Sequence, residues 1–338
     1  MYFSANDTIY CSILAVLTLF GIAANLLLLY MIICRSPQHL SPYRIFLGNT
    51  ALTQLLLSAS LLITSPRIFP QGYYIVNIYL GPVQLLTPWC CYMLYITMLH
   101  LAVNSFVSLM VSMIYRCISL RNAVITSCIA LQMCFAGYLI PFSMVASCVS
   151  MEYSADKSQA AELTHHLIAN IEKYAVVVAA RILQPCVIWN IICCSIFLLP
   201  VYATMYLCRW KILNYLNKVN YVQSSHNKLN IKRFVKALTI QSLVPTLSIF
   251  PPAIAYLLIQ FGTLQPHLIS YFIAPCLSIG PVLDPLITIY YVSPYRHLVE
   301  SLFFVHSDAS GSNQSGSQMM PSRSQSLKPA MFSIKQVV

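Results

Sequence analysis

One aspartate, Asp284, stands inside a long apolar stretch and is followed directly by a proline, in the sequence PVLDPLITIYY. An ionised carboxylate at mid-membrane depth costs on the order of 2.5–3.5 kcal/mol on insertion scales, so such a residue is a functional candidate by default. Pro285 removes a backbone donor and leaves a carbonyl free one turn earlier, which favours a bend. The other acidic residues are expected in loops, tails or termini.

This pattern predicts a conformational switch, because a buried acid beside a helix bend can change partners when the helix moves. The predicted switch residues are Asp284, Pro285, Tyr290 and Tyr291. The alternative is a static, protonated Asp284 that is hydrogen-bonded to a neighbouring helix. Both interpretations require that this stretch crosses a membrane.

The composition supports that requirement. The 338 residues are 58% hydrophobic and 8% charged, whereas soluble domains carry about 25% charged residues. The chain is therefore expected to be an integral membrane protein. Its formal net charge of +11 does not indicate nucleic-acid binding, because the basic residues lie in short loops between apolar runs.

Seven apolar runs are long enough to cross a bilayer core, which takes about 20 helical residues. They lie near 9–34, 44–65, 90–115, 124–147, 186–208, 236–261 and 267–292. The predicted fold class is an all-α membrane protein with seven transmembrane helices. Asn104, Ser105, Ser108 and Ser112 make the third run the most polar, so its helix is expected to face other helices.

The predicted organisation has three parts: an extracellular amino terminus at 1–8, a seven-helix domain at 9–292, and a cytoplasmic, mostly disordered tail at 293–338. The seven-helix domain contains a long outer loop at 147–185 and a basic inner loop at 209–236. Within the outer loop, the segment AAELTHHLIANIEKYAVVVAA has apolar spacing that would allow a short amphipathic helix.

The distribution of basic residues predicts an amino terminus outside and a carboxyl terminus inside. Of the 19 Lys and Arg residues, all but Arg67, Lys157, Lys173 and Arg181 then fall on the inner side. The sequence NDT makes Asn6 a candidate glycosylation site on the predicted outer side.

The cysteines allow one bridge at the outer face, where an oxidising compartment permits it. Cys90 or Cys91 would pair with Cys148 or Cys186, and the connectivity stays open. No metal site is predicted, because adjacent histidines in the outer loop would point to different faces of a helix. No cofactor is predicted either.

An enzyme is not expected from this sequence. It has no pair of intramembrane acids, no Ser/His pairing at membrane depth and no Gly-rich phosphate loop. One buried acid fits a proton-coupled transporter poorly. The last apolar run lacks a lysine for a retinal Schiff base and the third lacks an acid for amine recognition, so a bound small molecule should be neutral or apolar.

Four segments together resemble the nematode serpentine chemoreceptors, most closely class delta. They are SPQHLSPYRIFLGNTALTQ, SLMVSMIYRCISLR, KALTIQSLVPTLSIFPPAIA and PVLDPLITIYYVSPYR, spread over most of the spanning region. The resemblance implies a G-protein-coupled receptor for small, volatile or secreted molecules at the plasma membrane of sensory cilia. The implied partners are a small-molecule ligand, a heterotrimeric G protein and the lipid bilayer.

That resemblance gives the candidate residues roles. The switch residues stand where rhodopsin-like receptors carry an Asn-Pro-x-x-Tyr element, although the spacing to the tyrosines differs. The residues expected to face the G protein are Tyr115, Arg116, Arg121, Lys232, Arg233 and Lys236. The usual acid before the third-helix arginine is missing. The ligand cavity, among the outer halves of the third, fifth, sixth and seventh helices, is expected to include Asn104, Phe106, Tyr256 and Tyr271.

Two alternatives stay open. A ligand-gated cation channel with seven helices would have the inverted topology, which the distribution of basic residues disfavours. A non-signalling partner in the trafficking of other receptors would share the same sequence features.

Overall fold

The computed structural model describes residues 3–35, 41–119, 126–149, 171–219, 225–260 and 269–292, together with 295, 296, 298, 299 and 301. The chain forms two units, Met1–His297 and Leu298–Val338. All the helices and strands described below belong to the first unit. Nearly all of the predicted tail at 293–338 lies outside the described residues.

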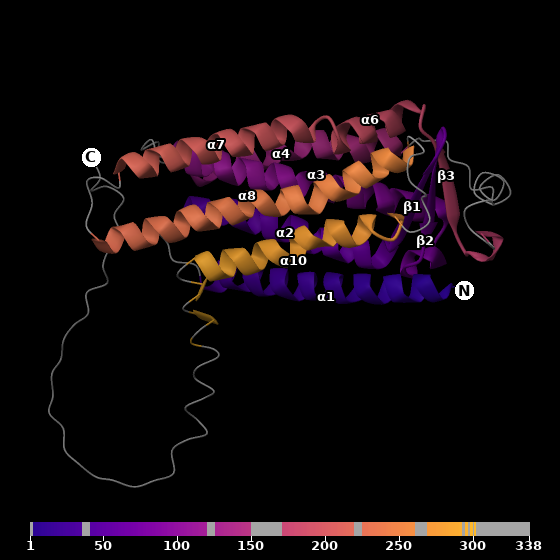
Figure 1. Cartoon of the computed structure of the whole chain (residues 1–338), viewed down its shortest axis with the longest axis horizontal. Coiled ribbons are helices and arrows are strands. Elements are labelled where there is room, and N and C mark those ends of the chain that lie inside the picture. The colour runs from indigo at the N-terminus through magenta and orange to yellow at the C-terminus, as the bar shows by residue number, and fades with distance from the viewer. Residues whose placement is uncertain are drawn as a thin grey trace, which may run out of the picture. The chain divides into compact units, whose positions relative to one another are not determined.

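Each of the seven apolar runs coincides with helical structure, and the helices lie side by side (Figure 1). The helices are α1 (Ala5–Cys34), α2 (Ser41–Thr64), α3 (Pro88–Ser119), α4 (Ser127–Cys148), α6 (Pro185–Cys194), α7 (Leu198–Val219), α8 (Ser225–Gln260) and α10 (Ile273–Tyr291). In the described part of the chain, six spans have the length and composition to cross a membrane, with α6 and α7 forming one. Helix α8 has a shorter apolar segment, Thr246–Ile259.

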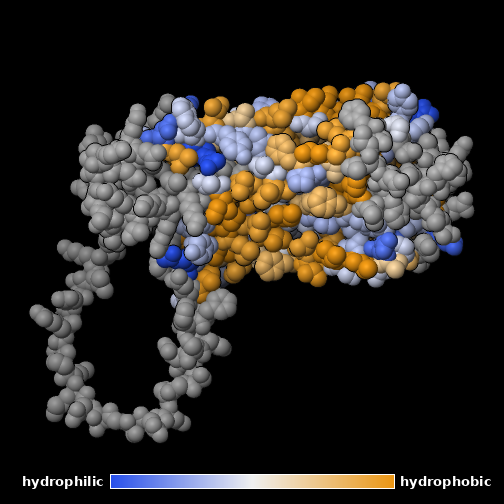
Figure 2. All heavy atoms as spheres, in the orientation of Figure 1, coloured by the Kyte–Doolittle hydropathy of each residue, from blue (hydrophilic) through white to orange (hydrophobic). Residues whose placement is uncertain are grey.

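The surface of the helices is apolar where a bilayer would contact it. Figure 2 shows hydrophobic residues over the middle of the helices and hydrophilic residues nearer their ends. Large apolar side chains such as Ile33, Phe135 and Leu139 are exposed on this surface. In water such a surface would be unfavourable, whereas lipid chains solvate it.

A three-stranded antiparallel sheet, which the apolar runs do not predict, covers one end of the helices (Figure 1). Its strands are β1 (Pro66–Gln71), β2 (Tyr74–Tyr79) and β3 (Val177–Arg181), in the order β1-β2-β3. We call this end, where α1 begins and α2 ends, the sheet end, and the other the opposite end.

The amphipathic helix suggested for the outer loop is wrong in its described part. Ile171–Lys173 forms one turn of 3₁₀ helix, and the run of valines that follows forms β3. β-Branched side chains fit a pleated strand better than a helix. Strand β2 also offers β3 a free edge, so its backbone groups are paired with those of β2.

Two local features set the ends of helices near the site. Ser4 and Asp7 form a capping box, so α1 begins at Ala5, earlier than the apolar run alone indicates. The predicted run 186–208 contains a break, because α6 ends at Cys194 and α7 begins at Leu198. The Ser195 hydroxyl donates to the Ile191 carbonyl at 2.5 Å beside this break.

Gly81 lets the end of β2 lie against the last turn of α2. A Cβ atom here would stand 2.2 Å from the Ile63 carbonyl oxygen. Backbone atoms of a packed helix cannot move far, so we expect Gly81→Ala to destabilise the protein by about 3 kcal/mol. Fluorescence-detected size exclusion after a heating series measures the effect.

Gly48→Ala is the matched control for this prediction. Among the described residues, a Cβ on Gly48 would meet only Ile32 Cγ2, at 3.8 Å, and alanine favours the helix by about 0.5–1 kcal/mol. We expect this variant to be at least as stable as wild type. A Gly81→Ala protein with wild-type thermal stability would contradict the close approach described above.

Candidate functional site

A cavity lies between the sheet and the helices that it covers. It encloses about 1180 Å³ of empty space, counting the open space at its mouth. The sheet contributes Ile68, Ile75, Asn77 and Ala180. The helices contribute Tyr92, Tyr95, Ile96, Leu99, Ala102, Val103, Val187, Asn190, Ile191, Cys194, Leu198, Ile249, Pro252, Ala253, Tyr256, Leu257, Ile273 and Leu277, and the break between α6 and α7 contributes Ser195.

The lining of this cavity is apolar and contains no charged side chain among the described residues. Its polar groups come from two asparagines, one serine and three tyrosines. Apolar surroundings with a few oriented polar groups are typical of sites for small neutral molecules. The break between α6 and α7 also borders the cavity, through Cys194, Ser195 and Leu198.

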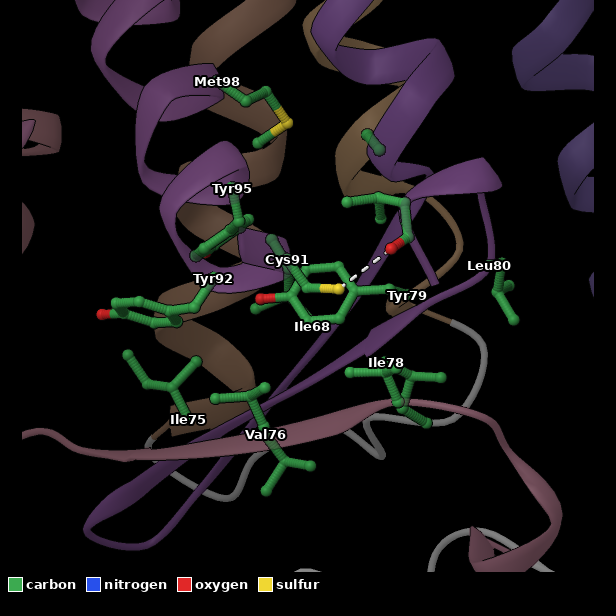
Figure 3. Packing of buried hydrophobic residues seen from close by; sticks show 14 of the residues in the cluster. Ile68, Ile75, Val76, Ile78, Tyr79, Leu80, Cys91, Tyr92, Tyr95 and Met98 are labelled. Atoms are coloured by element: carbon green, nitrogen blue, oxygen red, sulfur yellow. Dashed lines mark hydrogen bonds between the residues drawn. The ribbon is translucent and has the colours of Figure 1, made fainter. Parts of the chain in front are cut away.

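Aromatic packing holds the sheet against α3. Tyr79 of β2 lies 6.4 Å from Tyr95, ring to ring, and Tyr95 lies 6.3 Å from Tyr92. Figure 3 shows these rings with Ile68 and Cys91, whose thiol donates to the Val83 carbonyl at 3.1 Å. The sheet is therefore a fixed cover over this side of the cavity.

A buried ion pair ties the sheet to the first and last helices. Arg67 of β1 donates to Asp7 of α1 at 2.7 Å, and both side chains are almost fully buried. Tyr174 and Tyr271 also donate to Asp7, at 2.6 and 2.8 Å. Arg67 donates to Ser270 at 3.3 Å and lies 3.8 Å from the centre of the Tyr271 ring.

Sequence reasoning missed this network. Asp7, expected in the amino terminus, lies in the first turn of α1 and is fully buried, which its own position in the sequence did not indicate. A signal was present: Arg67 is an isolated cation between two apolar runs, in TSPRIFP. Burial raises the pKa of Tyr174 above its usual range, and the hydrogen bond to Asp7 raises it further. The Tyr174 hydroxyl therefore stays protonated and donates to Asp7.

Asp284 is buried in α10 and contacts α2. Gln54 Nε2 donates to Asp284 Oδ2 at 2.5 Å, and it also lies 3.4 Å from Ser105 of α3. Asp284 Oδ1 has no hydrogen-bond partner among the described residues. Two smaller cavities border Asp284: one of about 480 Å³ extends to Arg116, and one of about 280 Å³ includes Phe106.

The carbonyl that Pro285 leaves free in its own helix accepts a hydrogen bond from α1. Asn25 Nδ2 of α1 donates to the Pro281 carbonyl at 2.9 Å, which is the group that Pro285 cannot bond. Of the other switch residues, Tyr290 is exposed and Tyr291 is half-buried, with their rings 4.9 Å apart. The geometry brings Asp284 and Pro285 together with α1 and α2, but not with Tyr290.

The prediction that the third helix faces other helices is confirmed, because Asn104, Ser105, Ser108 and Ser112 are buried. Asn104 donates to Thr53 of α2 at 3.1 Å. Asn104 therefore belongs to the contact between α2 and α3 and does not line the large cavity.

The remaining residues suggested for the ligand cavity lie in three places. Tyr256 lines the large cavity beneath the sheet. Phe106 borders the smaller cavity beside Asp284, and Tyr271 lines a separate hollow with Asn6 and donates to Asp7.

At the opposite end, Arg116 is bound to a tyrosine. It donates to the Tyr43 hydroxyl, and its guanidinium lies 5.0 Å from the centre of the Tyr43 ring. Tyr115 stacks on Tyr43 at 6.0 Å. Arg121 lies outside the described residues. The backbone of Lys232, Arg233 and Lys236 lies in α8, and their side chains are outside the described part of the chain.

The outer cysteines and Asn6 have these positions. All thirteen cysteines are free in this structure. Cys148 contacts Cys186 through its thiol, while Cys91 is bonded to the Val83 carbonyl. The bridge from Cys90 or Cys91 stays a prediction.

Asn6 is exposed in the first turn of α1, and its glycosylation stays a prediction too.

Comparison with known proteins identifies related chains. A family model described as "Serpentine type 7TM GPCR chemoreceptor Srd" matches residues 9–301. Serpentine receptor class delta-32 of Caenorhabditis elegans is 41% identical over 304 residues, which cover 90% of each chain. Class delta-33 of the same organism is 41% identical over 302 residues, or 89% of this chain and 88% of the relative.

Solved structures match the fold. Squid rhodopsin superposes with a TM-score of 0.64 over 98% of this chain and 94% of its own, at 11% sequence identity. At that identity the likeness concerns the helical architecture alone.

Proposed function

Because the chain belongs to the Srd family of serpentine seven-helix chemoreceptors, we propose that it is a G-protein-coupled chemosensory receptor for a small, neutral or apolar molecule. The observation that carries this proposal is the uncharged cavity beneath the sheet. Its ligand is an environmental or secreted compound, and the plasma membrane of a sensory cilium is its proposed location.

Binding in this cavity can influence the opposite end through the helices that line it. Leu277 of α10 borders both the large cavity and the smaller one beside Asp284. From Asp284 a further cavity extends to Arg116 at the opposite end. In the proposed mechanism, a ligand favours one arrangement of α10 at its proline bend, and this exposes a cleft for Gα near Tyr115 and Arg116.

The amino terminus is proposed to be outside, which places the cavity outside and the basic residues of α8 inside. This orientation distinguishes the receptor from the alternative of a cation channel with inverted topology. Epitope tags at the two ends, stained before and after permeabilisation of cells, measure it. Staining of an amino-terminal tag in intact cells supports the receptor proposal, and staining of a carboxyl-terminal tag would favour the channel.

The function is tested by nucleotide exchange on Gα in membranes that contain this protein, with pools of small volatile and secreted compounds. A responding pool is expected to lose activity when the cavity is filled by Ala253→Trp, by about 10-fold or more in half-maximal concentration. Ala253 lines the cavity.

Ile254→Trp is the matched control, because Ile254 is the next residue on α8 and is exposed on the outer surface. It should keep the wild-type response. Equal loss in both variants would contradict binding in this cavity. Silence to every pool despite confirmed surface delivery would count against signalling and favour a role in trafficking other receptors.

A further inference from the structure

Asn190, which lines the large cavity, carries an unused hydrogen-bond acceptor. Its Nδ2 donates one hydrogen to the Cys186 carbonyl at 2.8 Å and the other to the Cys148 sulfur at 3.1 Å. Both donors of the amide are thereby occupied, which fixes the orientation of the side chain. Asn190 Oδ1 is buried and has no hydrogen-bond partner among the described residues.

A second acceptor of the same kind comes from the sheet. Asn77 of β2 is opposite Ile68 of β1 and Val178 of β3 in the register. Asn77 lines the same cavity as Ile68. The side chain is 1% exposed, and Asn77 Oδ1 also lacks a hydrogen-bond partner in the described part of the chain.

Two buried carbonyl oxygens in an otherwise apolar cavity determine which polar groups a bound ligand should carry. Both oxygens are buried without a partner among the described residues, and a hydrogen-bond donor on a bound molecule would supply the bond that they lack. A cation is disfavoured, because no described lining residue carries a compensating negative charge. A hydrocarbon, ether, ketone or ester leaves both oxygens unpaired.

We propose that the carbonyl oxygens of Asn77 and Asn190 are the polar recognition points of this cavity, and that its ligands are neutral, largely apolar molecules carrying a hydroxyl or N–H donor. This inference rests on the proposed receptor function and narrows the class of ligand. Alcohols with a medium-length alkyl chain or an aromatic ring are the simplest members of the class.

The test measures binding to purified receptor in lipid nanodiscs by calorimetry, without a G protein. Medium-chain and aryl alcohols are each compared with their methyl ethers, which have a similar apolar body but no donor. Wild type is expected to bind the better alcohols about 10-fold more tightly than the matched ethers, as the penalty for one unpaired buried oxygen implies.

Two variants assign the preference to the asparagines. Asn77→Val and Asn190→Leu should each reduce alcohol binding by about 10-fold and leave ether binding within about twofold. Thr97→Val is the matched control: it removes a hydroxyl from α3 that is bonded to its own helix at Met93 and does not line the cavity. Asn190→Leu could fail to fold, because the Cys186 carbonyl and the Cys148 sulfur lose a donor. In that case Asn77→Val still tests whether an asparagine causes the preference for alcohols over ethers.

Equal affinity of wild type for alcohols and ethers overturns the inference, as does the absence of binding by the whole alcohol set. A preference that persists in both asparagine variants overturns it too. Alcohol binding with the expected preference but no nucleotide exchange on any Gα would leave the binding site intact and refute the proposed function. Nucleotide exchange triggered equally by alcohols and ethers would support the proposed receptor function and refute the inference about hydrogen-bond donors.

Discussion

Arg67→Met is expected to destabilise the protein by about 3–5 kcal/mol, because it leaves a buried carboxylate without its cation. Asp7 and Arg67 are both almost fully buried, 2.7 Å apart. The guanidinium also bonds Ser270 and lies against the Tyr271 ring, so its loss loosens β1 from the turn that precedes α10. Thermal unfolding of detergent-solubilised protein, followed by fluorescence-detected size exclusion, measures the change.

The double variant Asp7→Leu/Arg67→Met separates loss of the pair from loss of one partner. Replacing a whole buried pair by apolar residues is often neutral, so we expect the double variant to recover most of the stability lost in the single one. An Arg67→Met protein as stable as wild type would show that the pair is not a structural tie. So would a double variant whose loss of stability equals the sum of the losses in Arg67→Met and in the single variant Asp7→Leu.

Asp284→Ala is expected to impair signalling far more than delivery to the cell surface. The contact of Asp284 with Gln54 joins α10 to α2 beside the bend at Pro285, and its removal uncouples the two helices at the proposed moving part. At matched surface level, we expect agonist-stimulated nucleotide exchange to fall about 10-fold or more, within the usual range of coupling between sites.

Two further variants on α10 make this prediction specific. Asp284→Asn keeps a carbonyl acceptor for Gln54 and should retain more exchange than Asp284→Ala. Leu286 is exposed on the outer surface, so Leu286→Ala should signal like wild type. A wild-type dose response of Asp284→Ala at matched surface level would support the static interpretation of this acid.

Most helices were predictable because the chain contains apolar runs near the length that a bilayer requires, although α6 and α7 share one run and the apolar segment of α8 is shorter. The break between α6 and α7 was missed, although Pro200 follows it directly in the first turn of α7, where a proline often marks the start of a helix. The strands of the sheet are five or six residues long, and β3 lies far along the chain from β1 and β2. Short apolar segments of that kind carry no distinct periodic signal.

The candidate site was predictable only where one residue was unusual by itself. Asp284 stood out as an acid in an apolar stretch, and its neighbour Pro285 indicated the free carbonyl that Asn25 satisfies. Asp7 and Arg67 each resembled an ordinary residue near a helix end, because their meaning lies in a contact across 60 residues. Asn77 and Asn190 likewise became notable only when the fold placed both on one cavity.

The network around Asp7 also bears on how the chain is made. The hydrogen bond from Tyr271 joins residues that are 264 positions apart. At a synthesis rate of roughly 5–20 residues per second, the two leave the ribosome on the order of 10–50 s apart. For that interval the Asp7 carboxylate lacks the hydrogen bond from Tyr271. Completion of this network therefore waits until the segment just before the last helix, α10, has been synthesised.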